Sequence, residues 1–279
     1  MKKINRRSFL AAAGLTAAAL ALTACGGSAS STASSTASSA ASSEAASTSA
    51  AAELTTVEAG KLTMATNAAF PPYEMTTDAG EFEGIDIDTA KAIAEKLGLE
   101  LQIDDMDFDA ALLSVQQGKA DIVMAGVTVT DERKAVMDFS DSYATGIQSI
   151  IVPEGSDITS PDDLAGKKIG TQRGTTGYIY CSDDFGDENV VAYDDGLTAV
   201  QALNNGQVDA VVIDNAPAQE FIVANPGLKI LDTSYAEEDY AIGMNKSNTA
   251  LLEAVNAALE ELKADGTLQA IVDKYIKAE

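Results

Sequence analysis

One helix–glycine–strand pattern that occurs twice constrains the fold more than any other feature. LLSVQQGKADIVMAG at 112–126 and VQALNNGQVDAVVID at 200–214 each combine a helical period, a glycine, an aspartate three residues later and a buried apolar strand. A second echo pairs LTMATNA at 62–68 with KIGTQRG at 168–174, in the same order. Because apolar runs alternate with helical periods along the chain, the fold class is α/β. The echoes predict two lobes of similar build.

The apolar periods also predict the individual elements. We expect strands at 61–66, 100–104, 122–125, 168–171 and 210–213, and helices at 87–97, 109–117, 198–204, 248–264 and 267–275, with a short capped helix beginning at 160. Ligands of open α/β sheets bind beyond the carboxyl ends of the strands. The residues expected there are Asn67, Ala125 and Gly126 in one lobe and Gln172, Arg173 and Asp214 in the other.

The composition excludes several classes of function. The 279 residues include no histidine, which removes Ser-His-Asp and Cys-His catalysis and imidazole metal ligands. A formal net charge of −25 argues against binding to nucleic acid. We find no spacing of metal ligands, and we expect no cofactor.

The N-terminus has the parts of an export signal. Residues 1–24 combine a basic start with an apolar, alanine-rich stretch, and the sequence before Cys25 resembles the lipobox of bacterial lipoproteins, in which the cysteine is acylated. Arg6 and Arg7 also resemble a twin-arginine motif, so the export route stays open. Residues 25–58, rich in Ser and Ala, are expected to form a lipid-anchored tether outside the membrane. Cys181 would then have no cysteine to pair with. We expect it to be a small buried or idle side chain and not a catalytic nucleophile.

Six motifs in order carry a family resemblance. They are TNAAFPPYE (66–74), GIDID (84–88), AGVTVTDER (125–133), DFSD (138–141), GTTG (174–177) and ADGT (264–267). The chain resembles the polar amino-acid family (family 3) of extracellular solute-binding proteins, which feed ABC importers, and its motifs look closest to glutamine-binding proteins. The resemblance implies a monomer with a type II periplasmic-binding-protein fold, whose lobes are joined by a two-segment hinge near 145–150 and 240–243. Lobe 1 would comprise 59–147 and 242–279, and lobe 2 would comprise 148–241.

The resemblance also assigns roles in binding an α-amino acid. Arg133 would hold the carboxylate, since a guanidinium binds carboxylate bidentately, although a surface charge is the alternative. Thr128 and the 174–177 turn with Thr176 would add donors. Asp214 would accept the ammonium group with the backbone at 125–126, although Asp214 also suits a helix cap. Phe70 and Phe108 would enclose the ligand side chain.

The identity of the amino acid stays open. Its side chain would meet Asn67, Gln172, Arg173 and Ile213. Relatives that bind cationic side chains often carry an acidic residue at the position of Asn67. The lack of an acid there disfavours arginine, lysine and histidine as the ligand. Arg173 would favour an acidic ligand, or face solvent. A neutral polar ligand such as glutamine or cystine is the first expectation.

Other functions remain as alternatives. The acids Asp104, Asp105, Asp107 and Asp109 would suit an enzyme, and some relatives of this fold are periplasmic dehydratases. We expect no enzyme, because these acids lie where helix caps and solvated charges are usual. A sugar or peptide receptor is disfavoured by the absence of tryptophan and by 5% aromatic residues. A sensor role would require a separate signalling partner.

Overall fold

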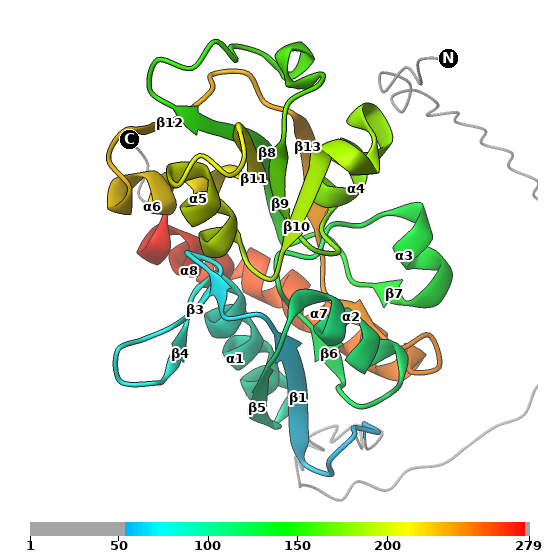
Figure 1. Ribbon diagram of the computed structural model, residues 1–279. Coiled ribbons are helices and arrows are strands. Elements are labelled where there is room, and N and C mark those ends of the chain that lie inside the picture. Colours follow the sequence, from blue (N-terminus) through cyan, green and yellow to red (C-terminus); the bar gives the residue numbers. More distant parts are fainter. Residues whose placement is uncertain (1–53, 277–279) are drawn as a thin grey trace, which may run out of the picture. The chain divides into compact units, whose positions relative to one another are not determined.

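The computed structural model describes residues 54–276, which form two sheets flanked by helices (Figure 1). The predicted signal, Cys25 and all but the last five residues of the predicted tether lie outside this range. The first sheet has the order β5-β1-β6-β14-β7. Its strands are β1 (Lys61–Thr66), β5 (Glu100–Asp105), β6 (Ile122–Val123), β7 (Asp138–Phe139) and β14 (Gly243–Met244). Strand β1 runs parallel to β5 and β6, whereas β14 is antiparallel to β6 and β7.

Five helices and a small hairpin sheet complete the first lobe. The helices are α1 (Ile85–Leu97), α2 (Phe108–Gln116), α3 (Asp131–Val136), α7 (Thr249–Ala264) and α8 (Thr267–Tyr275). The hairpin sheet consists of β2 (Ala69–Phe70), β3 (Glu74–Thr76) and β4 (Phe82–Glu83). Helix α1 packs against α7 and α8, and its apolar face belongs to the same buried core as β1 and α7. Phe70 and Phe82 of the hairpin sheet pack against the same core.

The second sheet has the order β10-β9-β11-β8-β12, and β13 pairs with the first half of β8. Its strands are β8 (Ala144–Pro153), β9 (Ile169–Gln172), β10 (Val190–Tyr193), β11 (Ala210–Asp214), β12 (Leu228–Ile230) and β13 (Ala236–Tyr240). The surrounding helices are α4 (Thr176–Phe185), α5 (Gly196–Asn204) and α6 (Asn215–Ala224), with 3-10 turns η1 (Pro161–Leu164) and η2 (Asp187–Asn189). The chain therefore forms an α/β fold of two similar lobes, as predicted.

The repeated sequence pattern corresponds to a repeated structure. In each lobe a helix, α2 or α5, leads into a strand, β6 or β11, that lies parallel to an earlier strand of the same sheet, β1 or β9. The glycines of the pattern, Gly118 and Gly206, have φ values of 67° and 66°, which a residue with a side chain rarely adopts. The aspartates that follow accept backbone N–H groups of the paired segment: Asp121 from Thr63 in β1 and Asp209 from Lys168, just before β9, each at 2.8 Å. The glycine–aspartate spacing that occurs in both lobes thus places a hydrogen bond between neighbouring segments of each sheet.

Two short segments connect the sheets. The chain leaves the first sheet after β7 and enters the second at β8, and it returns between β13 and β14. The two segments are hydrogen-bonded to each other, because the Ser140 N–H donates to the Ile242 carbonyl and the Ile242 N–H donates to the Ser140 hydroxyl, both at 2.9 Å. The whole of the predicted hinge segment at 145–150 lies within β8, where it pairs with β11 and β13.

The described chain differs from the predicted elements in several places, and its longest strand, β8, was not predicted as a strand. The strand expected at 122–125 ends at Val123, because the backbone turns toward Gly126, whose φ is 54°. Residues 54–58, assigned to the tether, contact the first lobe through the Val57 N–H, which donates to Asp121 at 2.8 Å. Between residues 54 and 276, no helix is long and apolar enough to cross a membrane.

Candidate functional site

A cavity enclosing about 440 Å³ of empty space, part of it open to solvent, lies where the strands β1, β6, β9 and β11 end. Residues of both lobes line it. All the predicted ligand-binding residues except Arg173 are among them. The lining residues are Asn67, Phe70, Glu74, Phe108, Ala125, Gly126, Thr128, Arg133, Gln148, Gln172, Thr175, Thr176, Val212, Ile213, Asp214 and Tyr240.

Arg173 lies away from the cavity. Its side chain is 53% exposed and approaches Asp194 at 3.4 Å. Successive residues of an extended segment point to opposite sides, so Gln172, at the end of β9, and Arg173 cannot both face inward. Gln172 is the inward residue, and its Nε2 donates to the Asn67 Oδ1 across the two lobes at 2.8 Å.

Arg133 supplies the cation of the cavity. It belongs to α3, which the Thr130 hydroxyl caps, and it is 8% exposed. Nη1 donates to the Thr128 carbonyl at 2.8 Å, and Nη2 donates to the Gly174 carbonyl of the other lobe at 3.1 Å. Among the described residues it has no ion pair with a carboxylate. Burial lowers the pKa of Arg133, but a guanidinium stays charged, so its free N–H groups suit an anionic ligand group.

Asp214 has two roles: it caps helix α6 and it lines the cavity. Its Oδ1 accepts the Ala216 N–H at 3.0 Å and caps α6. Its Oδ2 accepts the Ile147 N–H at 2.8 Å and the Tyr240 hydroxyl at 3.0 Å. Burial raises the pKa of Asp214 to about 6 despite these bonds. A nearby cation would therefore stabilise its charged form.

Aromatic rings form the walls. Phe70 stacks on Tyr73 with ring centroids 5.7 Å apart, and the Arg133 guanidinium lies 5.4 Å from the centroid of Phe108. A Cβ at position 126 would approach the Phe70 ring to 2.9 Å, and the φ of 54° also favours glycine. Gly126 thus lets the chain pass close to Phe70.

Sequence reasoning missed Glu238, which bridges the lobes. Its Oε2 accepts the hydroxyls of Thr128 and Thr176, each at 2.9 Å, and the Gln148 side-chain amide at 3.0 Å. Thr128 and Thr176 lie in different lobes, so one carboxylate on β13 holds both. The alternation of buried and exposed residues along β13 places Glu238 in the buried phase with Tyr240. An acidic residue at a buried position of an alternating strand was the sequence signal that could have identified Glu238.

Glu74 and Asp86 form a second group that the sequence did not single out. Glu74 is fully buried, lines the cavity, and lies beside Asp86, with which its carboxyl group interacts. Asp86 Oδ2 accepts the Gly126 N–H at 3.0 Å and the Tyr143 hydroxyl at 2.8 Å. Burial and the charge of Asp86 raise the pKa of Glu74 well above its ordinary value, and burial raises that of Asp86 to about 6. The pair can share a proton when the cavity is empty.

These buried acids make the stability of the empty protein depend on pH. Asp86 and Asp214 have folded-state pKa values of about 6, above the ordinary 3.8, so the folded state binds protons that the unfolded state does not. The free energy of unfolding should therefore rise as the pH falls from 7 to 5, by roughly 1 kcal/mol for each group. The acids with lowered pKa values, such as Asp88, titrate below this range. Urea titrations at the two pH values measure the difference, and a stability that falls toward pH 5 would contradict the assignment.

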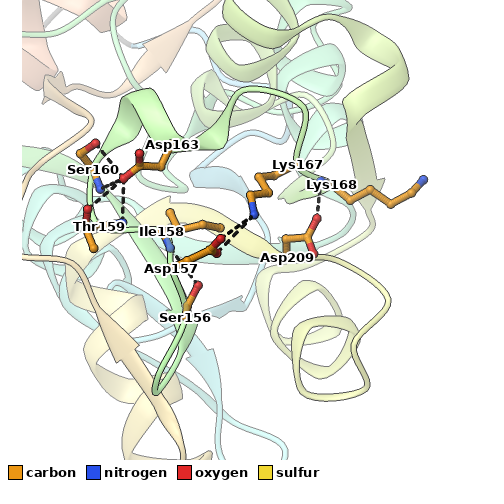
Figure 2. Close-up of polar contacts among 9 residues, drawn as sticks. All are labelled: Ser156, Asp157, Ile158, Thr159, Ser160, Asp163, Lys167, Lys168 and Asp209. Carbon is orange, nitrogen blue, oxygen red and sulfur yellow. Dashed lines mark hydrogen bonds and ion pairs between the residues drawn. The ribbon is translucent and has the colours of Figure 1, made fainter.

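A second cavity, which spans about 660 Å³ including space open to solvent, lies in the second lobe and differs in its chemistry. Lys167 pairs with Asp157 at 3.2 Å, and Asp209 accepts the backbone N–H of Lys168 at 2.8 Å, as Figure 2 shows. Beside it, Asp163 and Ser160 cap η1. Its lysine, Lys167, has a side chain that is 32% exposed, whereas the arginine of the first cavity, Arg133, is buried.

The acidic cluster considered for catalysis has structural roles in part. Asp105 accepts the Ala68 N–H at 2.8 Å, and Asp104 accepts a hydrogen bond from the Gln102 amide at 3.4 Å. Asp107 is the residue before α2, and Asp109 lies in its first turn. Across residues 54–276, no group of three or more His, Cys, Asp or Glu side chains could hold a metal ion.

Comparison with known proteins decides the family. The sequence model of the bacterial extracellular solute-binding proteins, family 3, matches residues 62–278. The chain belongs to this family. Family 3 membership agrees with the resemblance carried by the six motifs and with the fold, since the structural neighbours are two-lobed amino-acid-binding proteins.

Relatives within family 3 bind different amino acids. The chain is 32% identical to a probable histidine-binding protein of Neisseria gonorrhoeae, over 99% of this chain and 98% of that protein. It is 33% identical to the L-cystine-binding protein TcyJ of Escherichia coli K12, over 80% of this chain and 85% of that one. The structure of an ancestral arginine-binding protein bound to arginine is 44% identical and covers 78% of this chain and 98% of its own, with a TM-score of 0.74.

Proposed function

We propose that this protein captures a polar L-amino acid between its two lobes and delivers it to an ABC importer. The observation that carries the proposal is a buried guanidinium, Arg133, that has no carboxylate partner within residues 54–276 and lies in the same cavity as Asp214. An α-amino acid carries one carboxylate and one ammonium group, which these two charges complement. The chain would serve as a binding protein and not as an enzyme.

Closure of the lobes would complete the site. Arg133 and Thr128 come from lobe 1 (59–147 and 242–279), and Asp214, Gln172 and Thr176 come from lobe 2 (148–241). The contacts between Arg133 and Gly174 and between Asn67 and Gln172 already join the lobes. A ligand held by both lobes and the closed state would stabilise each other, because the open state offers only half of the partners.

Anchoring belongs to the same proposal. Export through residues 1–24 and acylation of Cys25 would hold the protein as a monomer on the outer face of the cell membrane, with residues 25–53 as a tether. With a net charge of −25, attachment would depend on the acyl chains and not on attraction to anionic lipid. Incorporation of labelled fatty acid into the wild type but not into Cys25→Ser tests this part.

Thermal unfolding in the presence of single amino acids tests the binding role. We expect the soluble form beginning at Ala52 to gain about 2.7 kcal/mol at a ligand concentration 100 times Kd. The panel should contain all common L-amino acids and cystine, with the corresponding D-amino acids as controls. A panel in which no amino acid raises the Tm contradicts the proposed function.

A further inference from the structure

We propose that Glu238 is a latch between the lobes: its buried carboxylate binds one hydroxyl from each lobe and so stabilises the closed arrangement even before an amino acid arrives. The inference rests on the closure that the proposed function requires, and it adds a residue that acts on this closure without touching the ligand. In this role Glu238 is a positioning residue, because it acts on the site through Thr128 and Thr176.

One carboxylate oxygen of Glu238 makes the contact. Oε2 accepts the hydroxyl of Thr128, from lobe 1, and the hydroxyl of Thr176, from lobe 2, each at 2.9 Å. It also accepts the Gln148 side-chain amide at 3.0 Å, and the two hydroxyl oxygens lie 3.4 Å apart. A rotation that separates the two threonines must therefore break at least one of the bonds to Oε2.

Burial makes these bonds strong. Glu238 is 7% exposed, and its Oε1 accepts no hydrogen bond from any residue between 54 and 276. Hydrogen bonds to a charged group contribute about twice as much as neutral ones, and a buried charge that loses its donors is costly. The charge of Arg133 also acts on this carboxylate. Opening the lobes would remove a donor from a buried charge, so it is opposed by this residue.

The backbone holds Thr128 beside the latch. Thr128 forms an isolated β-bridge with Tyr240, two residues after Glu238 on β13, and the Val129 N–H donates to the Asp239 carbonyl at 3.0 Å. Strand β13 pairs in turn with the first half of β8, so it belongs to the crossing between the two sheets. The latch therefore lies where lobe 1 meets the crossing segments.

The bonds of the latch need no ligand, because all their atoms belong to the chain. The three donors line the cavity, whereas Glu238 lies behind them and is not part of the lining. The contact between Asn67 and Gln172 also joins the lobes, but both of these residues are expected to meet the ligand side chain. An amino acid would therefore rearrange the contact between Asn67 and Gln172 and leave Glu238 in place.

Distances between the lobes, measured without a ligand, test the latch. Spin labels on exposed helix positions, Glu95→Cys in α1 and Asp183→Cys in α4, report the separation in the soluble form beginning at Ala52, and the buried Cys181 is protected from labelling. In Glu238→Gln, which keeps the shape but removes the charge, the ratio of closed to open molecules should fall roughly five- to thirty-fold. The control Glu237→Gln changes an exposed acid of the same strand and should leave the ratio unchanged.

Thr176→Val tests the same bond from the donor side. It removes one hydroxyl with little change in volume, so the ratio should fall in the same direction. The two substitutions combined should have less than the sum of their separate effects, because both remove the same bond. If Glu238 only supported the fold of β13, the Tm would fall without a change in the distances.

Affinity gives the second readout, with L-arginine, L-glutamine and L-cystine as probes. The Kd of each probe that binds should rise in Glu238→Gln by the factor by which the closed share falls. A lower Kd would mean that Glu238 competes with the ligand for the threonine hydroxyls and would overturn the latch, as would unchanged distances in both Glu238→Gln and Thr176→Val. If no probe binds the wild type and Glu238→Gln still opens the lobes, the proposed function fails and the latch stands.

Discussion

Replacing Arg133 with alanine is expected to abolish amino-acid binding while the protein stays folded. The guanidinium is buried, joins Thr128 to Gly174 and has no carboxylate partner among the described residues. Loss of a buried charge partner costs about 2–5 kcal/mol, or roughly 30- to several-thousand-fold in Kd. Calorimetry with the best ligand of the thermal panel measures the loss, and circular dichroism checks the fold.

Arg173→Ala is the matched control for this experiment. Arg173 is the nearby arginine whose side chain is half exposed and directed toward Asp194. Its removal should change the Kd less than about two-fold, since surface ion pairs contribute little. Normal binding by Arg133→Ala, or an equal loss in Arg173→Ala, would show that the carboxylate is bound elsewhere.

Asp214→Asn is expected to weaken binding by a similar amount through the other end of the ligand. The substitution keeps the shape of the side chain but removes the charge that the ammonium group would pair with, at a cost of about 2–5 kcal/mol. It also leaves fewer acceptors for the Ile147 N–H, the Ala216 N–H and the Tyr240 hydroxyl, so a lower Tm should accompany the effect.

The pH dependence distinguishes the loss of charge from the loss of packing. The pKa of Asp214 is about 6 in the empty protein, so affinity of the wild type should fall as the pH drops from 7 to 5. In Asp214→Asn this contribution should disappear. The control Asp194→Asn removes an acid whose side chain is 76% exposed and should keep both the affinity and its pH profile. A wild-type pH profile retained in Asp214→Asn would place the ammonium group on another acid.

Local sequence patterns were sufficient for the elements with a strong period. Helix α8 has the predicted bounds, and α1 and α7 differ from them by one or two residues, because apolar positions at helical spacing and the glycines after them are local signals. The short strands of the hairpin sheet were missed. A strand of two or three residues is too short to show a period, and its pairing depends on a partner strand.

The sequence by itself determined the two-lobed α/β fold, its internal repeat and the family, because these depend on spacing along the chain and on motifs in order. Only the tertiary structure decided which charges face the cavity. Gln172 points inward and Arg173 outward, Glu238 reaches threonines of both lobes, and Glu74 is buried beside Asp86. The burial of a carboxylate depends on side chains that other strands and helices bring to it, and distance along the chain does not encode those neighbours.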